Sequence, residues 1–182
     1  MRIYTKAGDD GTTGLFLGGR VSKADILLDA CGDVDEAVAV LGVARSGCED
    51  ARLRGILLDR QRELFVVAAD LATNPGHRDR LDPGISLVTT AMVEALERLI
   101  DELVAERPLR PVFIVPGATS VSAAIDHART VVRRAERHAV DAQVSGHTVS
   151  PLVLAYLNRL SDLAFVLARH AAGEHDEVPS HD

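Results

Sequence analysis

Hydrophobic side chains recur every third or fourth residue over five long segments of the chain, and they alternate with polar ones almost nowhere. In the first segment, Ile26, Ala30, Val34, Ala37 and Leu41 follow this spacing. Spacing of this kind is typical of a helix with one apolar face. The pattern predicts five helices, at residues 25–47, 52–73, 86–106, 120–143 and 150–172.

Helix-breaking and helix-capping residues separate these segments. Asn74, Pro75 and Gly76 follow the second segment and end it. Ser86 is the expected N-cap of the third helix, and Pro151 suits the first position of the fifth. Because the connections are short, the five helices are expected to form an all-α, up-and-down bundle.

Three stretches lie outside or between the helices. Residues 1–24 form a glycine-rich N-terminal arm, and residues 173–182 are expected to be a frayed, flexible tail. The valine-containing segment 112–115 is expected to be an extended connector. A chain of 182 residues has the size of one domain, so the arm, the bundle at 25–172 and the tail are expected to form a single domain.

Composition excludes several classes of protein. The chain is 47% hydrophobic and 26% charged, as soluble globular proteins are. A net charge of −7 argues against general binding to nucleic acid or to anionic membranes, and 3% aromatic residues argue against a base-stacking surface. There is no purely apolar stretch of transmembrane length, and the first 11 residues lack the apolar core of a signal peptide, so we expect a cytoplasmic protein.

The two cysteines, Cys31 and Cys48, form no CxxC pair and have no paired histidines nearby in the sequence. Neither a disulfide framework nor a metal site is predicted from them. They are expected to be small buried hydrophobic residues.

The arm has the composition of a phosphate-binding segment. Its first 20 residues hold five of the 14 glycines, and the only two lysines of the chain, Lys6 and Lys23, lie in or beside this run. Glycines let backbone N–H groups approach a ligand, and lysines are compact positive charges that suit a polyphosphate. The arm matches neither GxxxxGK[ST] nor GxGxxG, so a merely flexible arm remains the alternative.

A row of arginines marks the fourth predicted helix. Arg129, Arg133 and Arg137 follow one another at intervals of four and so share one face. Each adjacent pair of like charges destabilises an isolated helix by roughly 0.2–0.5 kcal/mol. Glu136 offsets only part of this charge, so an acid from another helix or subunit, or an anionic ligand, is expected beside it. The alternative is that these arginines form a basic face exposed to solvent.

Polar residues interrupt the leucine-rich fifth helix, where Asn158 and Asp162 share a face. The asparagine can recognise an adenine or ribose edge and the aspartate can orient an arginine, or both can lie at the solvent edge. Asp33, Asp35 and Glu36 in the first helix are either a water-facing acidic patch or counter-charges for the arginines.

These features occur together, and in this order, in a known family: the chain resembles the PduO-type ATP:cob(I)alamin adenosyltransferases. The most specific matches are TKAGDDGTTGL at residues 5–15 and RTVVRRAER at residues 129–137. The other matching stretches are residues 18–23, 32–36, 113–117 and 157–162.

The resemblance implies an activity and an assembly. The activity is transfer of the 5′-deoxyadenosyl group of ATP to cob(I)alamin, which gives adenosylcobalamin and triphosphate. The assembly is a homotrimer with ATP and Mg²⁺ at the subunit interfaces. A flavin-type reductase and an adenosylcobalamin-dependent mutase are the partners it implies. This chemistry needs no general acid or base.

The resemblance also implies a nucleotide site made of two groups of residues. The arm wraps the triphosphate, and helical residues meet the nucleotide from the other side. The arm group is Thr5, Lys6, Ala7, Gly8, Thr12, Thr13, Gly14 and Lys23, and the helical group is Arg133, Arg134, Ala135, Glu136, Arg137 and Asn158.

By the same resemblance, a few residues carry the catalysis. Asp35 and Arg129 would form an ion pair across the subunit boundary, and Asp162 would support the arginine cluster around Arg133. Phe113 would press on the lower face of the corrinoid and exclude its lower axial ligand.

The chain departs from the family pattern at Ala7, where threonine is common, at Ala118, where a second glycine is usual, and in a tail without an aromatic residue after Phe165. Two other functions fit the same motifs. One is a carrier that binds ATP or adenosylcobalamin and hands it to a mutase without turnover. The other is a nucleotide-sensing module without a corrinoid site.

Overall fold

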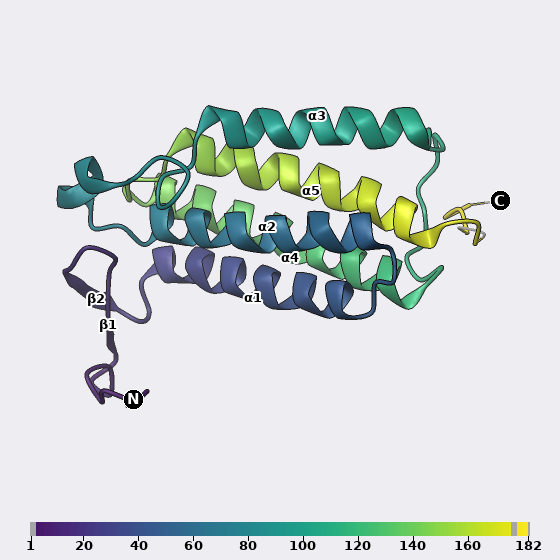
Figure 1. The fold of residues 1–182 in the computed structure, drawn as a ribbon. Coiled ribbons are helices and arrows are strands. Elements are labelled where there is room, and N and C mark those ends of the chain that lie inside the picture. The colour runs from purple at the N-terminus through teal and green to yellow at the C-terminus, as the bar shows by residue number, and fades with distance from the viewer. Residues whose placement is uncertain (1–2, 176–177, 182) are drawn as a thin grey trace.

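Five long helices make up most of residues 3–175 and 178–181, the part of the chain that this computed structural model describes (Figure 1). Successive helices run in opposite directions, which confirms the predicted all-α, five-helix bundle. The helices are α1 (Ile26–Ser46), α2 (Ala51–Leu71), α3 (Thr90–Glu106), α4 (Ser120–Val144) and α5 (Pro151–Ala172).

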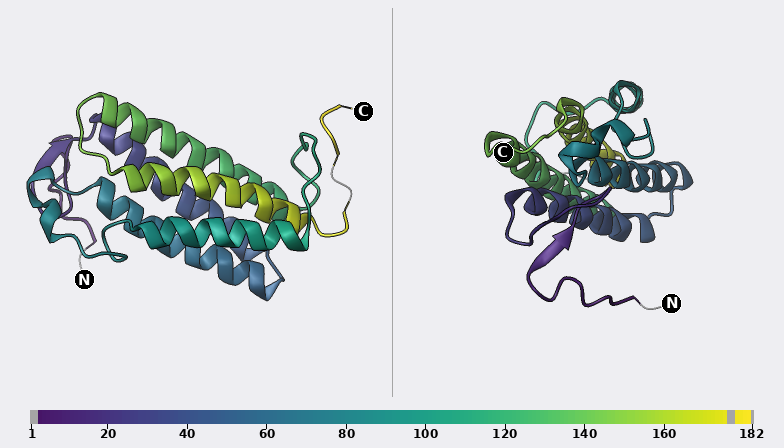
Figure 2. Two further views of the ribbon diagram at one scale, coloured as in Figure 1. Left: turned by 90° about the horizontal axis from the view of Figure 1, so that it is seen from above. Right: turned by 90° about the vertical axis from the view of Figure 1, so that its left-hand side faces the viewer.

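Helix α5 lies at the centre of the bundle and contacts α2, α3 and α4, while α1 packs between α2 and α4 (Figure 2). Its length and apolar composition would also suit a membrane span, but 56% of that apolar window is buried in the bundle. We therefore regard α5 as the core helix of the fold. The leucine-rich pattern of its sequence reflects burial by other helices.

Side-chain caps explain where the helices begin. Asp25, Asp50 and Ser150 each accept a hydrogen bond from a backbone N–H in the first turn of α1, α2 and α5, respectively. At α4, Thr119 and Ser122 form a reciprocal capping box. Such caps satisfy backbone donors that the helix itself leaves unpaired.

The third helix begins later than predicted. Thr89 is its N-cap, and Ser86 instead accepts a hydrogen bond from the Asp82 backbone N–H at 2.9 Å within a tight turn. The fully buried carboxylate of Asp70 accepts from the Val88 N–H at 3.0 Å and holds this segment outside the helix. The prediction of Ser86 as the cap is wrong because a contact from α2 overrides the local capping preference.

The arm contains two short strands that the sequence pattern does not predict. Strand β1 (Thr12–Gly14) pairs antiparallel with β2 (Arg20–Ser22), and the two are too short to show period-two alternation. Phe16 joins the arm to the bundle: its N–H donates to Ala72 O at 2.8 Å, and its carbonyl accepts from the Asn74 N–H at 3.0 Å. A 3₁₀ helix, η1 (Pro75–Arg80), follows α2 after the short connection 72–74.

Part of the tail pairs with the connector before α4. The Val115 N–H donates to Val178 O and the Ser180 N–H donates to Phe113 O, both at 2.8 Å. The connector is extended here, as expected. At these residues the tail differs from the frayed segment that its composition predicts, because backbone pairing with a distant loop orders it.

A polar group is buried in the core between α2 and α5. Tyr156 is fully buried, and its hydroxyl donates to the Glu63 carboxylate, which also pairs with Arg60 at 2.9 Å. Burial, and secondarily the charge of Glu63, raises the pKa of Tyr156 well above its ordinary value. The neutral phenol is therefore the form that the fold stabilises.

Tyr156→Phe is expected to lower the free energy of unfolding at pH 8 by about 1–3 kcal/mol, because Glu63 loses a buried donor. The pKa of Tyr156 is higher in the folded than in the unfolded chain, so its contribution is fully present below pH 10.0 and is lost as the pH rises further. Urea unfolding at pH 8 and pH 11 measures both effects. An equal loss in the variant at both pH values would contradict this assignment.

Candidate functional site

A cavity of about 490 Å³ lies along α3, α4 and α5. Its apolar wall comes from Ile100, Val104, Leu109, Phe165 and Val166. The polar residues at its edge are Glu97, Asp101, Arg129, Arg133, Arg159, Ser161 and Asp162.

A second hollow, of about 470 Å³, continues from this cavity around the loop before α4. It shares Leu109, Arg129 and Phe165 with the first cavity and adds Phe113, which is 84% exposed. Together the two hollows form one mostly apolar surface, which we call the apolar cavity.

A third hollow, of about 420 Å³, has a mostly polar lining and is here called the polar hollow. Arg133 lines both this hollow and the apolar cavity. The two therefore meet at one cation on α4. The residues of the polar hollow are Arg133, Glu136, Arg137, His138, Val140, Asp141 and Asn158.

The arginines of α4 have different partners. Arg129 Nε donates to Asp126 Oδ1 at 3.1 Å, so it has an ion-pair partner on its own helix. Arg137 Nη1 donates to the Arg133 carbonyl at 3.1 Å. The Arg133 side chain forms no ion pair with any residue in the described part of the chain. Its charge is therefore available to an anionic ligand.

Arg134 faces α1 and lies outside both hollows. Its Nε donates to Asp33 Oδ1 at 2.9 Å, and its terminal nitrogen pairs with Glu36. The hydrogen bond to Asp33 is the main cause that raises the pKa of Arg134. Of Asp33, Asp35 and Glu36, the first and the last are thus counter-charges to an arginine. Within this chain, then, Arg134 is not grouped with Arg133, although the resemblance implies a nucleotide contact for both.

Asp35 is exposed on α1 and forms no ion pair with Arg129 among residues 3–175 and 178–181. The ion pair expected between them is therefore absent within one chain. A pair across a subunit boundary remains a prediction.

A chain of hydrogen bonds connects the polar hollow to the apolar cavity. Asn158 Nδ2 donates to Glu136 Oε1 at 3.1 Å, and Asn158 Oδ1 accepts from Arg159 Nη1 at 2.8 Å. Arg159 Nε donates to Glu97 Oε1 at 2.8 Å. These bonds assign the orientation of the Asn158 amide. Asp162 lies 3.9 Å from Arg159 at the cavity edge, so the arginine that it supports within this chain is on its own helix.

Several residues of this site were not predicted, among them Arg159, Glu97 and Phe165. Arg159 directly follows Asn158 in the matching stretch 157–162, so its position gave a usable signal. Glu97 and Phe165 look like ordinary members of amphipathic helices. Only the packing of α3 against α5 shows that both line the cavity.

The arm has its own internal geometry. Lys23 Nζ donates to Gly8 O at 2.8 Å, so one of the two lysines holds the arm in shape. A Cβ at Gly8 would lie 3.0 Å from Thr12 O, which explains the glycine. Lys6 has φ 61°, a left-handed conformation that ordinary residues adopt at a cost of roughly 1–2 kcal/mol.

The arm and the helical group of predicted nucleotide residues are not brought together within this chain. The arm projects from the end of the bundle where α1 begins (Figure 1). No hydrogen bond or ion pair in the described part of the chain joins residues 5–14 to α4 or α5.

Comparisons with known proteins agree on one family. The family model described as cobalamin adenosyltransferase matches residues 3–171. A corrinoid adenosyltransferase from Mycobacterium tuberculosis (strain ATCC 25618 / H37Rv) is 44% identical over 96% of this chain and 91% of its own length. One from Citrobacter freundii is 40% identical over 92% of this chain and 93% of its own length.

Solved structures show the same similarity. One is a variant of the PduO-type ATP:corrinoid adenosyltransferase from Lactobacillus reuteri, complexed with cobalamin and ATP. It has a TM-score of 0.89 and 31% identity, with 100% of this chain and 97% of that chain covered. Another variant of the same enzyme, complexed with ATP, has a TM-score of 0.86 and 32% identity, with 97% and 99% covered.

Proposed function

This chain belongs to the cobalamin adenosyltransferase family. On that premise we propose which of its residues bind the nucleotide and which bind the corrinoid while the adenosyl group of ATP is transferred to cobalamin. The cobalt of cob(I)alamin supplies an electron pair to C5′ of ATP, so a Co–C bond forms. The C5′–O bond breaks, and its electron pair leaves with triphosphate. The protein must hold C5′ over the cobalt and stabilise a highly charged leaving group.

We assign the nucleotide to the polar hollow and the corrinoid to the apolar cavity. The observation that carries this assignment is their junction at Arg133, which lines both and has no ion-pair partner in the described residues. A cation there can neutralise triphosphate as it leaves while the adenosyl group faces the cavity. We assign contact with the nucleoside to Asn158, whose amide is oriented by Arg159.

The apolar cavity suits the second requirement of the reaction, a cobalt that can be reduced. Loss of the lower axial ligand makes four-coordinate cobalt(II) easier to reduce, as the family resemblance implies. We assign exclusion of that ligand to Phe113 and the neighbouring wall that contains Phe165 and Leu109. The carbonyl of Phe113 is paired with the tail, which supports a defined position for this loop.

The arm supports a site shared between subunits. Thr5, Lys6 and Gly8 do not reach α4 of their own chain, so we propose that the arm covers the polar hollow of a second copy in a homotrimer. Asp35, exposed on α1, is the proposed partner of Arg129 across the same boundary. Sedimentation equilibrium with and without ATP tests this assembly.

The metal ion, the reductase and the recipient of the product are inferred from the chemistry of the reaction, not from a site on the protein. In the described residues, no group of three or more His, Cys, Asp or Glu side chains is arranged to hold a metal ion. We propose that Mg²⁺ is bound by the triphosphate oxygens and enters the site with ATP. A cytoplasmic flavin-type reductase is the proposed source of cob(I)alamin, and an adenosylcobalamin-dependent mutase is the proposed recipient of the product.

An anaerobic assay with ATP, Mg²⁺ and chemically reduced cobalamin tests the function directly. Loss of cob(I)alamin and release of triphosphate are followed together, and equal amounts of adenosylcobalamin and intact triphosphate are expected. Tight corrinoid binding without turnover would favour a carrier instead. Nucleotide binding without any corrinoid binding would favour a nucleotide-sensing module.

Lys6→Ala is expected to raise KM for ATP about tenfold, because a charge-assisted contact to phosphate is lost. The KM for cob(I)alamin should stay the same, since the arm is assigned to the nucleotide alone. Steady-state kinetics with each substrate varied in turn measures both constants. Arg98→Ala, which removes a cation that is 69% exposed on α3, is the control and should change neither. A rise in both constants for Lys6→Ala would contradict the assignment.

A further inference from the structure

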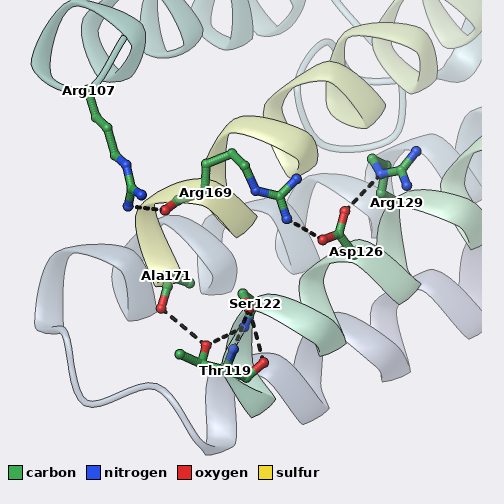
Figure 3. Close-up of polar contacts among 7 residues, drawn as sticks. All are labelled: Arg107, Thr119, Ser122, Asp126, Arg129, Arg169 and Ala171. Carbon is green, nitrogen blue, oxygen red and sulfur yellow. Dashed lines mark hydrogen bonds and ion pairs between the residues drawn. The ribbon is translucent and has the colours of Figure 1, made fainter. Parts of the chain in front are cut away.

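A buried carboxylate lies behind the wall of the apolar cavity. Asp126 on α4 is only 2% exposed, and both of its oxygens accept from arginines (Figure 3). Oδ1 accepts from Arg129 Nε at 3.1 Å, and Oδ2 accepts from a terminal nitrogen of Arg169. A carboxylate is retained at such a depth only when it is paired and hydrogen-bonded in this way.

The two arginines connect Asp126 to neighbouring parts of the same wall: Arg169 packs against Phe165, and Arg129 is itself part of the wall. Arg169 is 4% exposed, and its guanidinium carbon lies 4.8 Å from the centre of the Phe165 ring, within the range of a cation–π contact. The Arg129 side chain is 27% exposed. Arg129 and Phe165 both line the two hollows that form the apolar cavity. One carboxylate therefore holds two adjacent pieces of the wall.

The geometry determines which atoms of Arg129 remain for the corrinoid and for the proposed Asp35 of a second copy. Its Nε is used by Asp126, and in the described residues its two terminal nitrogens form no hydrogen bond. Figure 3 shows these nitrogens on the side of the guanidinium away from Asp126. Without Asp126, the long side chain would be free to adopt other rotamers, and ordering it would oppose ligand binding.

The neighbouring backbone is also fixed. Arg107 donates to the Arg169 carbonyl, and Thr119 Oγ1 donates to the Ala171 carbonyl at 3.2 Å (Figure 3). These bonds hold the last turns of α5 against α4 and the end of α3. Asp126 and Arg169 thus meet across two helices whose relative position is set independently of either side chain.

We propose that Asp126 is a positioning residue for the corrinoid site: it orients Arg129 so that its terminal nitrogens face the apolar cavity. The inference rests on the proposed placement of the corrinoid and deepens it. Asp126 itself is too deeply buried to touch a substrate, so it acts through Arg129. Because the nucleotide is assigned to the polar hollow, replacing Asp126 should leave the affinity for ATP unchanged.

Asp126→Asn tests this role, because the amide keeps the size of the side chain but loses the charge. We expect Kd for cob(II)alamin, titrated by absorbance with ATP present, to rise about tenfold, with Kd for ATP within about twofold of the wild type. In an Arg129→Ala background the same substitution should have no further effect on Kd, because the residue through which it acts is gone.

Two further variants separate positioning from folding. Asp126→Leu combined with Arg169→Met removes both buried charges, a change that proteins often tolerate without loss of stability. It should fold and still show the weaker cob(II)alamin binding. Asp70→Asn is the matched control: it removes another buried carboxylate, one that pairs with Arg78 away from the cavity, and should lower the melting temperature without changing either Kd.

The outcomes distinguish this inference from the proposed function. If wild-type protein makes no adenosylcobalamin, the proposed function fails whatever Asp126 does. If wild-type protein is active and Arg129→Ala weakens corrinoid binding, but Asp126→Asn binds as the wild type does, the positioning role is wrong. Additive effects of Asp126→Asn and Arg129→Ala would overturn it as well.

Discussion

Arg133→Ala is expected to lower kcat for adenosyl transfer by about 1,000-fold, the upper end of the effect of removing one group that stabilises developing charge. Arg133 lies where the polar hollow meets the apolar cavity, and its charge has no ion-pair partner in the described part of the chain. Triphosphate gains negative charge as the C5′–O bond breaks. An unpaired cation at this junction therefore acts more strongly in the transition state than on bound ATP.

Single-turnover kinetics with preformed cob(I)alamin measures this loss without the reduction step. Arg133→Lys should retain an intermediate rate, since it keeps the charge but loses the planar, bidentate geometry. Arg62→Ala removes an arginine whose side chain is 70% exposed on α2 and serves as the matched control with wild-type kinetics. If Arg133→Ala keeps its activity, the phosphate site lies elsewhere.

Leu163→Ala is expected to lower the free energy of unfolding by about 3 kcal/mol, within the range for removing a fully buried leucine from a packed core. Leu163 is 0% exposed on α5, the helix that contacts three others. A cavity left there is surrounded by helices that cannot all move inward together. Both KM values should stay unchanged at temperatures well below the melting point, because Leu163 lines neither hollow.

Chemical denaturation measures the stability loss, and two substitutions serve as controls. Val43→Ala, at a position 64% exposed on α1, should change stability by no more than about 0.5 kcal/mol. Asp162→Asn, one residue before Leu163 and exposed at the cavity edge, should affect kinetics more than stability. Equal loss of stability in Leu163→Ala and Val43→Ala would contradict the central position of α5.

The helices were predictable because their signals are local. Apolar spacing and capping residues act within one or two turns, and the first, second, fourth and fifth predictions agree with α1, α2, α4 and α5 to within about two residues at each end. The third prediction began too early because the deciding contact comes from Asp70, which lies in a different helix. Strands β1 and β2 carry too few residues to show a period.

The motifs of the arm and of α4 identified the chemistry for the same reason: the residue types stand close together in the sequence. Through the family resemblance that they carry, TKAGDDGTTGL and RTVVRRAER predict which side chains meet a polyphosphate. They do not show how the arm and the helices come together. Within one chain the two groups remain apart, which is why a second subunit enters the proposal.

The sequence by itself therefore determined the helical architecture and the set of residues suited to a nucleotide and a corrinoid. Only the tertiary structure decided where these side chains lie and what they contact. Arg133 and Arg134 are neighbours with identical side chains, yet successive helical positions point about 100° apart. Arg134 meets Asp33 and Glu36 on α1, whereas Arg133 faces the two hollows. Likewise, Asp126 meets Arg169 only because α4 and α5 pack side by side. Contacts between residues so distant in the chain leave no trace in local spacing.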